Sequence, residues 1–138
     1  MCYVSLRDED GENVMTGAKR ILLVEDDAEL CDATSIGLNR RGYEVSAFVD
    51  PQAARAAFER DPASWDLVIT DQNMPGLTGC ELIRIVKQRR RDLPVILWSS
   101  ASPGSAVEAD RVLCKPVENR VLLQTMRGLL DRAGPARA

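Results

Sequence analysis

Short apolar runs alternate with longer amphipathic stretches along most of this sequence. Five short runs have the pattern of strands: ILLV at 21–24, YEVSAF at 43–48, LVIT at 67–70, PVILW at 94–98 and RVLC at 111–114. Runs of this kind are typical of strands buried in a parallel sheet. The second run alternates apolar and polar positions more than the others do, which is typical of a strand near the edge of a sheet.

Stretches with helical spacing of apolar residues follow four of these runs, the last at about 117–132. The ends of the helices carry recognisable signals: Asp27 and the Asp50–Pro51 pair suit helix starts, and Gly42 suits a helix stop. The helix faces that we expect to be buried consist of Leu30, Cys31, Thr34 and Leu38; Ala54, Ala57 and Phe58; Leu82 and Val86; and Leu122, Met126 and Leu129.

This alternation predicts an α/β fold with a doubly wound, five-stranded parallel sheet of the flavodoxin-like order 2-1-3-4-5 and helices on both faces. We expect one folded domain at 19–132, between a flexible, acidic tail at 1–18 and a short C-terminal tail at 133–138. Between the fourth and fifth runs only 104–110 has room for a helix, of two turns at best. The fourth helix is therefore expected to be short or absent.

Composition narrows the class of protein. The chain of 138 residues suits one globular domain, with 45% hydrophobic and 28% charged residues. The net charge of −3 gives no electrostatic footprint for nucleic acid, so we expect no DNA binding. No apolar run is long enough to span a bilayer and the N-terminus has no apolar signal core, so we expect a cytoplasmic protein without membrane contact.

Histidine is absent, and the four cysteines are scattered without paired spacing. The lack of histidine excludes hydrolysis by a serine–histidine–aspartate triad. The cysteine pattern argues against a zinc site or a disulfide framework and favours a reducing environment. We expect most of the cysteines, Cys114 among them, to act as small apolar residues of the core.

Polar residues stand directly after four of the predicted strands. They are Glu25, Asp26 and Asp27 after the first, Asp71 after the third, Ser99 and Ser100 after the fourth and Lys115 after the fifth. In the predicted topology these strand ends meet at one crevice. Crowded carboxylates repel one another unless cations lie among them, and Lys115 supplies only one positive charge. All-oxygen ligands favour Mg²⁺ as the second cation, and the space between the metal and Lys115 suits a phosphoryl group with Asp71 as its nucleophile.

Four motifs in this order resemble the receiver domain of two-component response regulators. They are VEDD at 24–27, DLVITDQNMPGLTG at 66–79, PVILWSS at 94–100 and VLCKP at 112–116. The resemblance extends over about 19–132, which is nearly the whole predicted domain. Each motif is weak by itself, whereas the four together are specific.

The resemblance implies a role for each of the residues at the strand ends. Asp71 matches the phosphoacceptor, Ser99 the hydroxyl that bonds the phosphoryl oxygen, and Lys115 the lysine that pairs with the phosphate. In that family the Lys–Pro bond is typically cis. The implied Mg²⁺ ligands are Asp71 and Asp26 directly, Glu25 through water, and Asn73 through its backbone carbonyl. Asp27 is expected to cap the first helix instead of binding the metal.

The function that we expect is that of a stand-alone receiver. It would accept a phosphoryl group from a sensor histidine kinase or a phosphotransfer protein, and it would signal to a downstream protein by contact, without turning over a substrate as an enzyme does. Two alternatives remain open: a degenerate receiver that acts unphosphorylated as an interaction module, and a receiver excised from a hybrid histidine kinase. A haloacid-dehalogenase-like phosphatase is a third, although Asn73 stands where it needs a general acid.

Some positions depart from the family pattern or carry a separate expectation. Val112 occupies the place of a Tyr or Phe whose ring turns inward on activation in many receivers, so the output surface is expected to be altered. Ser100 lacks an acid to steer water, which predicts slow self-dephosphorylation. Strand alternation places Trp98 under or beside the site. The basic run at 87–91 is expected to be a solvated helix end.

Overall fold

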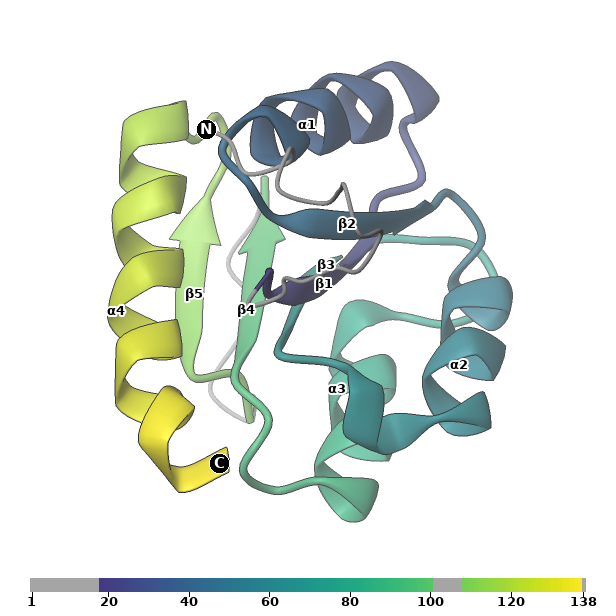
Figure 1. Cartoon of the computed structure of the whole chain (residues 1–138). Helices are drawn as coiled ribbons and strands as arrows, with labels where there is room; N and C mark the ends of the chain where they lie inside the picture. Colours follow the sequence, from purple (N-terminus) through teal and green to yellow (C-terminus); the bar gives the residue numbers. More distant parts are fainter. Residues whose placement is uncertain (1–17, 101–107, 138) are drawn as a thin grey trace, which may run out of the picture.

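The computed structural model describes the backbone of residues 18–100 and 108–137, with side chains as far as Asp131 (Figure 1). The tail expected at 1–18 therefore lies almost wholly outside the described residues. The same holds for most of the segment 104–110, for which a short or absent fourth helix is predicted.

Five strands form one parallel sheet in the order β2-β1-β3-β4-β5, which confirms the predicted fold class and strand order. Their bounds are β1 Arg20–Val24, β2 Glu44–Phe48, β3 Leu67–Asp71, β4 Val95–Ser99 and β5 Arg111–Cys114. In the register of the sheet Asp71 lies beside Trp98, and Ser99 lies beside Cys114. The carboxyl ends of the central strands thus lie together at one end of the sheet.

The described residues form four α-helices and one short 3₁₀ helix. Their bounds are α1 Ala28–Arg40, α2 Pro51–Arg60, η2 Pro62–Ser64, α3 Gly79–Arg89 and α4 Asn119–Arg137. Asp27 and Asp50 cap α1 and α2 through their side chains, as predicted. The closing helix α4 begins two residues later than predicted, at Asn119, and its backbone continues past the predicted end at 132 to Arg137.

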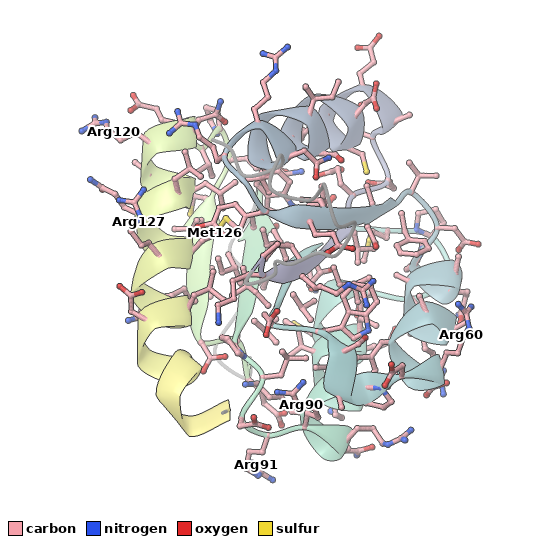
Figure 2. All side chains as sticks on the ribbon, in the orientation of Figure 1. Arg60, Arg90, Arg91, Arg120, Met126 and Arg127 are labelled. Carbon is pink, nitrogen blue, oxygen red and sulfur yellow. The ribbon has the colours of Figure 1, made fainter. Side chains whose placement is uncertain are left out.

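The sheet is covered on both faces (Figure 1). One core cluster joins residues of β1, β3 and β4 to α2 and α3, and a second joins the opposite faces of these strands to α1 and α4. Figure 2 shows Met126 of α4 directed toward the sheet and Arg120 and Arg127 directed away from it. Burial of this apolar face, with Met126 fully buried, is what holds α4 against the sheet.

Two predictions about individual side chains are wrong. Cys114 is exposed instead of buried in the core, because it lies on the same face of β5 as exposed Val112, and no described helix covers that face. The basic run at 87–91 is only partly solvated: Lys87 is buried, and Arg90 donates from Nη1 to the carbonyls of Pro62 and Trp65. These contacts are between residues far apart in sequence, which a charge count along the chain does not reveal.

Candidate functional site

Glu25 follows β1 and is almost completely buried, with 1% of its surface exposed. Its backbone N–H donates to the carbonyl of Phe48 in β2 at 3.0 Å, which fixes the chain as it leaves the sheet. Its side chain accepts from the backbone N–H of Asp27 through Oε2 at 3.0 Å, and Lys115 Nζ lies 2.5 Å from its Oε1. Each oxygen of this buried carboxylate therefore has a polar partner, which offsets part of the cost of removing it from water.

The environment of Glu25 favours the protonated form of its carboxyl group. Burial raises the pKa of Glu25 above its ordinary value of 4.5, and the neighbouring Asp71 carboxylate also raises it. The Lys115 ammonium and the Asp27 N–H lower the same pKa, but burial is the larger effect. A further cation beside Glu25 would favour the ionised form of this carboxyl group.

Asp71 is the last residue of β3, and it is buried. Its Oδ1 accepts from the backbone N–H of Gln72 at 2.7 Å, and its Oδ2 lies 3.5 Å from Lys115 Nζ. The single ammonium of Lys115 thus lies between two carboxylates that come from strands β1 and β3. This is the convergence that the order of strands predicts.

The first turn of α3 lies directly against the backbone of Asp71. A Cβ atom on Gly79 would come within 2.1 Å of the Asp71 carbonyl oxygen and 2.9 Å of Leu97 Cδ1, so a larger residue at 79 would force the helix away. Gln72 holds the helix in place, because its carbonyl accepts from Gly79 N–H at 3.0 Å and its Oε1 accepts from Cys80 N–H at 2.9 Å. Thr78 and Glu81 complete the start of the helix with reciprocal capping hydrogen bonds.

The other predicted site residues surround this centre. Asp26 is exposed next to Glu25, and Asn73 is exposed two residues after Asp71. Ser99 ends β4 and is 1% exposed, one position beyond the residue that pairs with Asp71. The backbone N–H of Lys115 donates to the Ser99 carbonyl at 2.8 Å, which joins β4 and β5 at the site, and the Lys115–Pro116 bond is cis, as predicted.

Three carboxylates of the site are close enough to share a cation. Ligand oxygens of Glu25, Asp26 and Asp71 all lie within 4.8 Å of one another, and this is a cluster of side chains that come from the ends of two adjacent strands. An all-oxygen, anionic donor set with one exposed member suits a hard divalent cation that keeps some of its water ligands. The residues present therefore fit a metal site.

Two residues that shape the site have no clear signal in the sequence. Gln72 and Gly79 position α3 against Asp71, yet only the glycine could have been suspected, as a small residue after the turn at Met74–Pro75–Gly76. Strand alternation predicts the position of Trp98 correctly: the residue is 3% exposed, and Lys115 Nζ lies 5.2 Å from the centroid of its ring. A cation over an indole face at this distance is attracted to it.

This fold and site identify the class of protein, and comparison with known families agrees. Residues 21–127 match the response regulator receiver domain family, which is the greater part of the chain. The chain therefore belongs to the response regulator receiver domain family. Members of this family interact with histidine kinases.

Among curated proteins the chain resembles the regulatory protein VanRB of Enterococcus faecalis, with 35% identity over 121 residues. The match covers 83% of this chain and 54% of VanRB, so the chain spans about half the length of that relative. Among solved structures it resembles a CheY-like receiver of Methanospirillum hungatei, with a TM-score of 0.80, 27% identity and coverage of 87% and 99% of the two chains.

A third similar protein is the response regulator TrrA of Thermotoga maritima, solved in complex with Mg²⁺ and BeF. Its TM-score is 0.74 at 28% identity, over 80% of this chain and 98% of that one. Among the described residues of the present chain, no helix combines the length and the apolar composition that crossing a bilayer requires.

Proposed function

We propose that this chain is a phosphoacceptor of a two-component phosphorelay, which takes a phosphoryl group from the phosphohistidine of a sensor histidine kinase or phosphotransfer protein onto Asp71. The observation that carries the proposal is the position of the Lys115 ammonium between the Glu25 and Asp71 carboxylates, 2.5 Å and 3.5 Å from their nearest oxygens. A partly buried lysine in this place provides a positive charge for an incoming phosphoryl group.

The transfer is a substitution at phosphorus. A carboxylate oxygen of Asp71 forms the new O–P bond while the P–N bond to the donor imidazole breaks, and the imidazole nitrogen keeps the electron pair of that bond. Asp71 does not need a general base, because its carboxylate is already an anionic nucleophile. Lys115 pairs with a phosphoryl oxygen, and the Ser99 hydroxyl donates to another, which favours the charge distribution of the transition state.

The metal that we propose for the acidic cluster is Mg²⁺. Asp26, Asp71 and the Asn73 carbonyl would hold it, with Glu25 acting through water, and when bound it supplies the positive charge that the metal-free cluster lacks. The complex of the related TrrA with Mg²⁺ and BeF supports this choice of cation. Asp27 contributes only its backbone N–H, which donates to Glu25, because its carboxylate caps α1.

The phosphorylated protein then acts by contact with a downstream protein in the cytoplasm, and the phosphoryl group leaves by hydrolysis of the acyl phosphate. We propose that the chain works as a stoichiometric phosphoacceptor with Mg²⁺-dependent self-phosphorylation and self-dephosphorylation, and that it does not turn over phosphomonoesters. The latter activity would instead mark a haloacid-dehalogenase-like phosphatase.

The decisive experiment incubates the protein with acetyl phosphate and Mg²⁺ and locates the modification by intact-mass and peptide analysis after borohydride trapping. We expect one phosphoryl group per chain, on Asp71, which disappears in Asp71→Asn and in the presence of EDTA. Absence of any modification in the folded wild-type protein would identify a degenerate receiver. Continuous hydrolysis of p-nitrophenyl phosphate would favour the phosphatase.

A further inference from the structure

A lysine that is more deeply buried than Lys115 lies at the opposite end of the sheet from the candidate site. Lys87 of α3 is 8% exposed, and its Nζ donates to the carbonyls of Leu93 and Arg91 at 2.7 and 3.2 Å and to Asp110 Oδ2 at 2.9 Å. These three acceptors satisfy all three donors of the ammonium group. The mechanism above makes no use of this pair.

We propose that Lys87 and Asp110, here called the β5 clamp, are positioning residues that fix the register of β5 and so place Lys115 beside Asp71. The inference rests on the proposed function of Asp71 and Lys115. The proposal adds Lys87 and Asp110, which are remote from the phosphoryl group, as the residues that determine whether the Lys115 ammonium reaches that group.

The clamp joins β5 to β4 at the point where pairing of the two strands begins. Asp110 N–H donates to the Val95 carbonyl at 2.9 Å, and Asp110 Oδ2 accepts from Val95 N–H at 2.8 Å, so one residue makes a two-way connection to β4. Lys87 holds the same carboxylate oxygen from α3. Asp110 is therefore fixed both to the neighbouring strand and to a helix.

This anchoring matters because β5 is short and lies at the sheet edge. It has four residues, pairs with β4 alone, and carries Lys115 immediately after its last residue. A slip of β5 by one residue would move Lys115 by about 3.3 Å along the strand and would turn its side chain to the other face of the sheet. That displacement is comparable with the whole 3.5 Å separation of Lys115 Nζ from Asp71 Oδ2.

Arg90 provides a matched control at the end of the same helix. It also anchors the end of α3 through partly buried hydrogen bonds, but these go to Pro62 and Trp65, which precede β3, and neither goes to β5. Figure 2 labels Arg90 at this end of the molecule. Loss of Arg90 should weaken the fold without changing the register of β5.

The test compares the wild type, Lys87→Met/Asp110→Asn and Arg90→Met in the full chain. The double variant leaves no unpaired buried charge, and the amide oxygen introduced at position 110 still accepts from Val95 N–H, so the variant is expected to fold. Two quantities are measured: hydrogen exchange of the Lys115 amide relative to amides of β1, and the rate of phosphorylation by acetyl phosphate at saturating Mg²⁺. Urea denaturation gives the free energy of unfolding of each variant, so that the two can be compared at known stability.

We expect the clamp variant to show roughly tenfold faster relative exchange at Lys115 and roughly tenfold slower phosphorylation, because misplacing a reacting group by about 1 Å can cost a hundredfold in rate. Arg90→Met should match the wild type in both quantities. Equal values for the two variants would overturn the proposal and leave the clamp a purely structural contact. If the wild type is not phosphorylated at all, the proposed function fails, whereas the exchange rates still decide whether the clamp fixes β5.

Discussion

Lys115 makes a closer ion pair with Glu25 than with Asp71: its Nζ lies 2.5 Å from Glu25 Oε1 and 3.5 Å from Asp71 Oδ2. One ammonium thus serves two buried carboxylates, and the nearer one is not the proposed phosphoacceptor. A cation bound by the carboxylates would relieve Glu25 of its dependence on Lys115. The ammonium would then be available to a phosphoryl group on Asp71.

Removal of this ammonium should impair phosphorylation more than folding. We expect Lys115→Met to be phosphorylated by acetyl phosphate roughly a hundredfold more slowly, a loss typical of deleting one charged group that stabilises a transition state. The measurement is the initial rate of phosphoprotein formation at saturating Mg²⁺. Lys19→Met, which removes a lysine next to the other end of β1, is the control, and an equal loss in both variants would contradict the role of Lys115.

The raised pKa of Glu25 predicts a pH dependence of stability in the metal-free protein. At a pH above this raised pKa the buried carboxylate is ionised, and its burial lowers the free energy of unfolding by the largest amount. As the pH falls from that value toward 4.5, the folded state takes up a proton that the unfolded state does not. This contribution to the free energy of unfolding therefore increases as the pH falls, by at most about 1.4 kcal/mol per pH unit.

Glu25→Gln isolates this effect, because the amide carries no proton equilibrium in this range. In EDTA, the stability advantage of Glu25→Gln over the wild type should be largest at neutral pH and should shrink toward pH 4.5, as measured by urea denaturation. Glu29→Gln, at an exposed position of α1, controls for the loss of one carboxylate. A constant difference between Glu25→Gln and the wild type across this range would mean that Glu25 has no raised pKa.

The approach of α3 to Asp71 makes Gly79 sensitive to the smallest substitution. In Gly79→Ala the new methyl group would collide with the Asp71 carbonyl oxygen, at 2.1 Å, so the backbone must shift. We expect a loss of about 1–3 kcal/mol in the free energy of unfolding, as overpacking commonly causes, together with weaker Mg²⁺ binding. Gly128→Ala in α4 meets no atom within 4 Å and should be neutral or stabilising by up to about 1 kcal/mol.

The order of the strands and the residues at their ends could be predicted because both follow from local patterns. Four-residue apolar runs reveal strands, and right-handed crossovers leave few ways of ordering them. Asp71 and Lys115 were brought together by that reasoning alone. The distances between them and the partner that Lys115 prefers depend on packing between segments 90 residues apart, which no local pattern encodes.

Lys87 shows how a charge can mislead. Its position four residues after Ile83 places it on the buried face of α3, whereas its membership of a basic run predicts a solvated side chain. The helical period therefore predicts the burial of Lys87 correctly, and the basic composition of the run predicts it wrongly. Its acceptor Asp110 is 23 residues away, so the pairing itself could not have been read from the sequence.

The exposure of Val112 predicts that phosphorylation and the readout of the phosphorylated state can be separated. Val112 is 40% exposed on β5, so a tyrosine there has room and should leave the rate of phosphorylation within about twofold of the wild type. We expect Val112→Tyr to change the binding of the downstream partner instead, because the partner is expected to contact this surface. Val121→Tyr, at a similarly exposed position on α4, is the control. A large loss of phosphorylation in Val112→Tyr alone would show that this position belongs to the chemistry of the site.

The contact between Lys115 and Trp98 predicts an optical signal for occupation of the site. The ammonium lies 5.2 Å from the centroid of the Trp98 ring, so any ligand that draws Lys115 toward Asp71 changes the field at the indole. The other tryptophan, Trp65, lies beside Arg20 at the opposite end of the sheet, and Trp65→Phe therefore leaves Trp98 as the only tryptophan emitter. In this background Mg²⁺ with beryllium fluoride should change the intensity of emission, and EDTA should reverse the change.

The same titration of Trp65→Phe/Lys115→Met should give a much smaller change, because the cation that couples the site to the ring is gone. An unaltered response in that double variant would mean that the metal reaches Trp98 by another route and that Lys115 does not move when the site is filled.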